Sequence, residues 1–128
     1  MRVAAGRDFQ GNVMGATAST GTGIYAAANF IALTESAVAP ADADTALAGE
    51  LTAGGLARAQ AAYAKTAGSS SYTLTKTFTS ADGVTRTIAK IGVLNAASLG
   101  TLVFETAVPS PPALVSGDQV ALTETVTI

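Results

Sequence analysis

The chain has 128 residues with seven basic and nine acidic side chains, a formal net charge of −2 and a charged fraction of only 12%. Histidine and cysteine are both absent, which excludes a disulfide framework and nucleophilic catalysis by a Ser–His or Cys–His pair. Neither a basic stripe nor an acidic tail is present, so we expect no direct binding to nucleic acid or to an anionic membrane. A surface so poor in charge suits a subunit that stays packed against copies of itself or against a scaffold.

The first part of the chain is rich in Gly, Ala, Ser and Thr and shows no periodic apolar pattern. Such a segment loses much conformational entropy on ordering and has few apolar side chains to offset the loss. We therefore predict an extended N-terminal arm over residues 1–27 that becomes ordered on assembly. The residues spaced along it as anchors, and hence as candidate interface residues, are Arg2, Arg7, Phe9, Met14 and Tyr25.

The first strand is predicted at residues 29–36, and a turn follows around Pro40. Asp42 and Asp44 precede an alanine- and leucine-rich segment that ends at Gly54-Gly55, which predicts a short helix with aspartate at its N-terminus. Residues 56–66 fit either a helix or a strand that has Leu56, Arg58, Gln60 and Ala62 on one face. We favour a strand because regular strand patterns follow closely.

Strict alternation predicts a strand at residues 72–79, with Tyr72, Leu74, Lys76 and Phe78 on one face and threonines on the other. Residues 119–128 alternate in the same way and predict a terminal strand held in a sheet. Between them, residues 86–112 predict a hairpin, with apolar strands on either side of a turn and prolines that end it. Its apolar character places both strands in the middle of a sheet, with Phe104 in the core.

These patterns predict about six strands and one short helix. They are typical of an all-β protein, an antiparallel β-sandwich or jelly-roll-like barrel, over residues 28–128.

Several residues match part of a known binding or catalytic motif but lack its remaining residues. Gly21-Thr22-Gly23 begins like a nucleotide-binding fingerprint but lacks its next glycine, and Asp42 and Asp44 have calcium-loop spacing without the distal glutamate. Glu35, Glu105 and Glu124 could pair as catalytic carboxylates, but strand glutamates are usually solvated. Lys76 and Glu124 interrupt apolar strand faces, so each must reach solvent, pair with the other across the strands, or be buried at a subunit contact. We predict no cofactor, no metal and no enzymatic activity.

The segments FIALTES, ADADTALAGELTAGGLARA, YTLTKTFT, IGVLNAASLGTLVFETAV and GDQVALTETVTI, taken together, resemble a group of small virion proteins of tailed bacteriophages. The resemblance covers roughly residues 29–128. Leu99 stands where a second glycine often precedes Gly100. Such proteins decorate the capsid, serve as tail or baseplate accessories, or form fibre segments, and the resemblance supplies no catalytic motif.

The resemblance and the low charge lead to the hypothesis of a virion structural subunit, made in the host bacterial cytoplasm. We expect a capsid decoration (cement) protein that binds the shell as a symmetric oligomer, with copies of itself and the major capsid or tail proteins as partners. The alternative is a tail fibre or baseplate module that binds a host surface glycan through the loops at residues 68–71 or 109–116.

Overall fold

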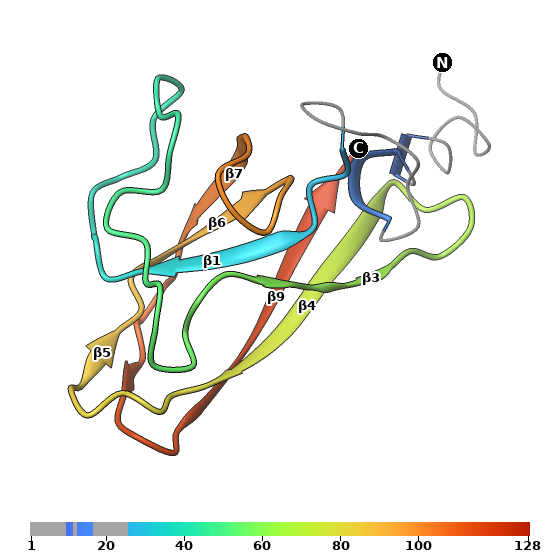
Figure 1. Cartoon of the computed structure of the whole chain (residues 1–128). Helices are drawn as coiled ribbons and strands as arrows, with labels where there is room; N and C mark the ends of the chain where they lie inside the picture. The colour runs from blue at the N-terminus through green and yellow to red at the C-terminus, as the bar shows by residue number, and fades with distance from the viewer. Residues whose placement is uncertain (1–9, 12, 17–25) are drawn as a thin grey trace.

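The computed structural model describes residues 10–11, 13–16 and 26–128, and these form an antiparallel β-sandwich (Figure 1). The all-β fold class predicted from the sequence is confirmed. A four-stranded sheet has the order β2-β1-β6-β7, with bounds Ala59–Gln60, Phe30–Thr34, Lys90–Leu94 and Leu102–Ala107. A three-stranded sheet has the order β3-β4-β9, with bounds Ala62–Ala64, Ser71–Thr79 and Gln119–Thr127. A short pair, β5 (Arg86–Thr87) and β8 (Ala113–Leu114), lies at the end of the sandwich away from the C-terminus.

The two longest strands, β4 and β9, pair along their full nine-residue length. On each strand the apolar alternate positions face inward and the threonine positions face solvent, as the sequence predicts. Thr75 and Thr123, for example, are directly opposite each other on the exposed face. The strict alternation fixes the register, because a shift of one residue would expose the whole apolar set.

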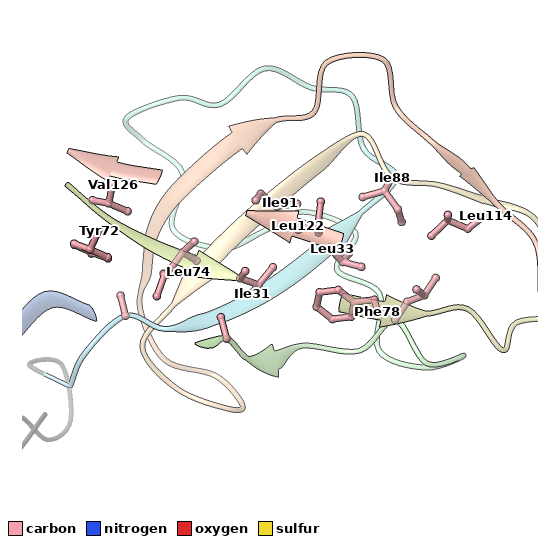
Figure 2. Packing of buried hydrophobic residues seen from close by; sticks show 14 residues of the cluster. Ile31, Leu33, Tyr72, Leu74, Phe78, Ile88, Ile91, Leu114, Leu122 and Val126 are labelled. Atoms are coloured by element: carbon pink, nitrogen blue, oxygen red, sulfur yellow. The ribbon is translucent and has the colours of Figure 1, made fainter. Parts of the chain in front are cut away.

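The core lies between the two sheets (Figure 2). Ile31 and Leu33 of β1 cluster with Leu74 of β4, and all three are completely buried. Burying each such side chain stabilises the fold by about 1.5–3 kcal/mol. Figure 2 shows that the same cluster continues toward the short sheet. Its members there are Phe78, Ile88, Leu114 and Leu122.

The predicted hairpin is present, but its two strands differ in environment. All five residues of β6 are buried, and β6 lies between β1 and β7. β7 is the last strand of its sheet; Val103 is 44% exposed and Phe104 is only partly buried against the core. The prediction that both strands are central is therefore wrong for β7, because nothing in the apolar sequence distinguishes a middle strand from an edge strand with one covered face.

The hairpin turn is tightly bonded and includes two left-handed residues. The Thr101 N–H donates to the Asn95 side-chain oxygen at 2.7 Å. Leu99 has φ 54° and Gly100 has φ 77°. Leu99 thus adopts the backbone conformation that favours glycine.

The helix predicted to begin near Asp42 is absent, and this prediction is wrong. The segment instead follows β1: the Leu51 N–H donates to the Leu33 carbonyl at 2.8 Å, and Glu50 bridges Thr34. The Thr34 hydroxyl also contacts the Ala48 and Gly49 carbonyls, at 2.7 and 3.1 Å. These bonds to β1 take the place of helical ones, so tertiary contacts override the helix propensity of alanine.

The strand predicted at residues 56–66 is present as two short strands, β2 and β3, which belong to different sheets. The chain passes from one sheet to the other at Ala61, which is buried and whose N–H donates to the Asn29 carbonyl at 2.8 Å. The single face predicted for this stretch is wrong. Leu56 is buried, whereas Gln60 and Ala62 are exposed, because the crossing changes which side of the chain faces the core.

We predict that Phe78→Ala and Phe104→Ala differ in cost. Phe78 is 3% exposed, so its truncation should lower the unfolding free energy by about 3–5 kcal/mol. Phe104 retains hydrated surface, so its loss should be about 1–3 kcal/mol. Urea unfolding of both variants measures the difference. Equal losses would contradict the placement of Phe104 at a sheet edge.

Candidate functional site at the open side of the sandwich

The two sheets end on the same side in β7 and β9, and a pocket of about 390 Å³ lies there. The Thr106 hydroxyl of β7 donates to the Glu124 carboxylate of β9 at 2.8 Å and bridges the two sheets. The predicted Lys76–Glu124 pair is therefore wrong: the partner of Glu124 lies in the opposite sheet, and the residue opposite Lys76 is Leu122. The pocket is lined by Pro40, Ala41, Asp42, Asp44, Leu102, Val103, Phe104, Glu105, Thr106 and Glu124.

A buried ion pair supports the wall of this pocket. The Lys90 ammonium group of β6 lies 3.2 Å from the Glu105 carboxylate of β7, and the two side chains are 3% and 5% exposed. The expectation of a solvated glutamate is wrong for Glu105. The sequence signal was Lys90 itself, a charge within an apolar run, which requires a partner on the neighbouring strand.

Asp44 reaches the same pair from the loop after β1. Hydrogen bonding with the Glu105 side chain is the main cause that lowers the pKa of Asp44 from its ordinary value. The Ala41 N–H, which donates to Asp44 at 3.0 Å, and the charge of Lys90 act in the same direction. The side chain of Asp44 lines the pocket together with Glu105, and its bond from the Ala41 N–H closes this loop beside β7. The prediction that Asp44 caps a helix is wrong, because no helix follows it in the described part of the chain.

The acidic residues around the pocket do not form a metal site. Across residues 10–11, 13–16 and 26–128, no three acidic side chains are placed to hold a metal ion. Lys90 also neutralises the most buried carboxylate. The arrangement can accept hydrogen bonds, and its polar contacts keep β7 in place against β6 and β9.

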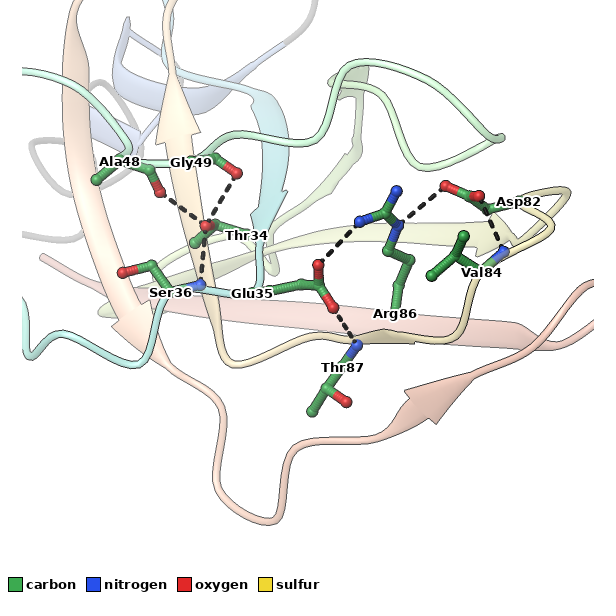
Figure 3. A network of polar contacts seen from close by, with 9 residues as sticks. All are labelled: Thr34, Glu35, Ser36, Ala48, Gly49, Asp82, Val84, Arg86 and Thr87. Carbon is green, nitrogen blue, oxygen red and sulfur yellow. Dashed lines mark hydrogen bonds and ion pairs between the residues drawn. The ribbon is translucent and has the colours of Figure 1, made fainter.

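A second polar network joins β1 to β5 (Figure 3). Arg86 donates to Glu35 at 3.1 Å and to Asp82 at 3.0 Å, and the Thr87 N–H donates to Glu35 at 2.9 Å. The Thr87 bond is the main cause that lowers the pKa of Glu35, and Arg86 is the main cause that lowers the pKa of Asp82. The Glu35 side chain is partly exposed, but its carboxylate joins the end of β1 to β5 through Arg86 and Thr87.

Arg58 fixes the tip of the hairpin. Its guanidinium group binds both oxygens of Glu50, at 2.9 and 2.6 Å. It also donates to the carbonyls of Ala96 and Leu99, at 3.0 and 2.7 Å. This bidentate contact holds the turn that contains the left-handed Leu99, whose side chain is 88% exposed.

Of the five predicted interface residues, Arg2, Arg7, Phe9 and Tyr25 lie outside the described residues. Met14 is described: it packs against the core, and its carbonyl accepts a hydrogen bond from the Ala28 N–H at 2.7 Å. Residues 10, 11 and 13–15 are helical, so the short helix of this fold lies here and not after Asp42. An interface role for these side chains stays a prediction.

Neither loop predicted to bind glycan, residues 68–71 or residues 109–116, is among the residues that line the pocket between β7 and β9. Residues 69 and 71 line a separate hollow of about 300 Å³ with Lys65, Thr66 and Tyr72. Residues 109–116 include β8 and pair with β5. No helix among the described residues is long and apolar enough to cross a membrane.

A model of the protein family described as "Podophage GP4 fiber I protein gp80" matches residues 11–127. The chain belongs to this family. No curated protein and no solved structure matches it. The gp80 family match begins at residue 11, so it includes much of the leader that the initial resemblance, which began near residue 29, left out.

Membership in the gp80 family confirms the resemblance to small structural proteins of tailed-phage virions. The family description names a fibre, which is closer to the alternative derived from the sequence than to capsid decoration. Capsid decoration, our first expectation, finds no support in this match.

We predict that Lys90→Met lowers the unfolding free energy by about 3–5 kcal/mol, because it leaves the Glu105 charge buried without its partner. The double variant Lys90→Met/Glu105→Leu should recover most of the loss, since apolar residues can replace a buried pair at little cost. Lys76→Met on β4 is the matched control, and its loss should be much smaller. A single variant as stable as wild type would contradict the burial of this pair.

We predict that the unfolding free energy of Arg86→Gln changes less with pH in the acid range than that of the wild-type protein. Because the folded pKa values of Asp82 and Glu35 are lowered, their stabilisation is complete above the ordinary values of 3.8 and 4.5 and is lost as the pH falls through the lowered ones. The difference in unfolding free energy between wild type and Arg86→Gln should therefore shrink in acid. Urea unfolding from neutral pH to the acid limit measures it, with Lys76→Gln as control. A constant difference would show that Arg86 does not act through these carboxylates.

Proposed function

We propose that this chain is a non-enzymatic structural subunit of a tail-associated fibre of a tailed-phage virion. The observation that carries the proposal is the family match over residues 11–127, whose description names a fibre protein. A fibre subunit needs a rigid scaffold that contacts other chains over much of its surface. The sandwich fits this need, with an apolar core and exposed faces of threonine in place of charge.

The chemistry of the described residues supports a structural role. Three basic side chains each form an ion pair with a carboxylate within the domain: Arg58, Arg86 and Lys90. These ion pairs connect loops and strands within the domain. We propose copies of the chain and neighbouring tail proteins as its partners.

Recognition of a host glycan is not part of this proposal. Glycan sites commonly use aromatic platforms. Phe104 is the one aromatic residue that lines the pocket between β7 and β9, and its ring packs toward the core. Three glutamate or aspartate side chains there, Asp44, Glu105 and Glu124, already hold neighbouring groups of the protein.

Localisation on the particle tests the proposal. Antibody labelling of gradient-purified virions of a phage that encodes this chain should place the protein on fibres, with the heads unlabelled. A nonsense mutation in its gene should give particles with normal heads and without the corresponding fibre density in cryo-EM maps. An antibody against the major capsid protein is the control. Labelling spread over the head lattice, or absence of the protein from purified virions, would refute the fibre role.

A further inference from the structure

We propose that β9 is a subunit interface, at which two copies of this chain pair antiparallel about a two-fold axis at Thr123. The three-stranded sheet has the order β3-β4-β9, so one side of β9 is bonded to β4 and the other faces outward. Among the described residues no strand pairs with that outer side. An unpaired strand edge is a template for another chain.

β9 is the longest edge strand among the described residues. It has nine residues, whereas the other edges, β2, β3 and β7, have two, three and six. The loop that carries Asp44 also lies beside β7 at the pocket. Edge strands that avoid pairing usually carry lysine, proline, a bulge or an inward-pointing charge. The sequence of β9, QVALTETVT, has no lysine and no proline, and its pairing with β4 shows no register shift. Its one inward charge, Glu124, is already bonded to Thr106 within the subunit.

The hydrogen-bond pattern identifies the backbone groups that face outward. The Ile128 N–H donates to the Ser70 carbonyl at 2.7 Å, and the Ser80 N–H donates to the Asp118 carbonyl at 2.8 Å. Both bonds belong to the same antiparallel register, so the even-numbered residues of β9 direct their N–H and C=O groups toward β4. The odd-numbered residues direct theirs outward. They are Gln119, Ala121, Thr123, Thr125 and Thr127.

The β9 strand of a second copy fits this edge better with the two-fold axis at Thr123 than with the axis moved by one residue in either direction. With the axis at Thr123, all nine residues are paired, and each outward-facing residue donates one hydrogen bond and accepts one. Ala121 then lies opposite the partner subunit's Thr125. Glu124 lies opposite the partner subunit's Leu122. An axis at residue 124 would instead place the two glutamates opposite each other, which is unfavourable, and either neighbouring register leaves strand ends unpaired.

The side chains also match across such an interface. On the exposed face, only alanine, threonine and the terminal glutamine meet, without charge. On the inner face, Val120 meets the partner subunit's Val126. Glu124 is already bonded to Thr106 within its own subunit, so it is not required to find a partner across the axis. The two three-stranded sheets would join into one continuous sheet.

The self-complementary sequence is what selects a second copy as the occupant. With the axis at Thr123, the two Thr123 residues face each other, Val120 faces the partner subunit's Val126, and no like charges meet, which suits an isologous contact between two copies. The interface does not depend on the fibre assignment.

Sedimentation velocity and native mass spectrometry of the full chain test the pairing, and we expect a dimer in exchange with monomer. Thr123→Lys places two ammonium groups across the axis and should weaken dimerisation by about tenfold or more. Thr75→Lys is the matched control: Thr75 lies directly opposite Thr123 on the same exposed face, but on the middle strand β4. It should leave the dimer intact. Circular dichroism confirms that both variants are folded.

A charge swap tests the axis itself. Thr123→Lys and Thr123→Glu should each dimerise poorly alone and form a heterodimer when mixed, which native mass spectrometry identifies by mass. In the wild-type protein, amide exchange at Ala121, Thr123 and Thr125 should slow as concentration rises. A wild-type chain that stays monomeric, equal effects of Thr123→Lys and Thr75→Lys, or a trimer would each overturn the proposal. None of these results bears on where antibody finds the protein on the virion, so the two proposals fail separately.

Discussion

The nine-residue pairing of β4 with β9 is the constraint on which the rest of the structure depends. Because side chains alternate along both strands, the pairing places one apolar row of each strand against β1 and β6 and leaves two rows of threonine in solvent. The pairing joins two strands that are far apart in the chain, so the segment between them must leave β4 and come back to it as β9. Within that segment, the hairpin of β6 and β7 forms part of the opposite sheet.

Strict alternation made part of this fold predictable from the sequence. The strands at residues 72–79 and 119–128 were placed with the correct faces, and β1 within two residues, because the period-two pattern has no competing helical interpretation. Residues 42–51 were misassigned because alanine favours a helix in isolation, whereas Thr34 and Leu33 supply backbone and hydroxyl bonds that only the folded protein offers. Ala61 gives no local signal that the chain changes sheets there.

The candidate site was less predictable than the fold, because it depends on pairs of residues and on sheet order. Lys90 showed that a charge was present in an apolar strand, but its partner Glu105 is set by the hairpin register. Glu124 was expected to pair along its own sheet, and its bond to Thr106 crosses between sheets. Sequence patterns give the direction of a side chain within a strand, but they do not say which strand lies across the core.

The two sheets are joined differently at their two sides, β2 with β3 on one side and β7 with β9 on the other. The Thr106–Glu124 bond and the Lys90–Glu105 pair both lie on the second side. On the first side, the chain itself crosses between the sheets at Ala61, so β2 and β3 are joined covalently and stay short. On the second, open side the chain passes from β7 to β9 by way of β8 and not by a direct crossing. There the Thr106–Glu124 bond joins the two sheets, and the buried Lys90–Glu105 pair holds β7 against β6. Polar bonds in this position specify the relative placement of the two edges more than they add stability. The edge of β9 is thereby held in a defined position with its outward backbone groups unpaired, and the proposed pairing of two copies depends on this placement.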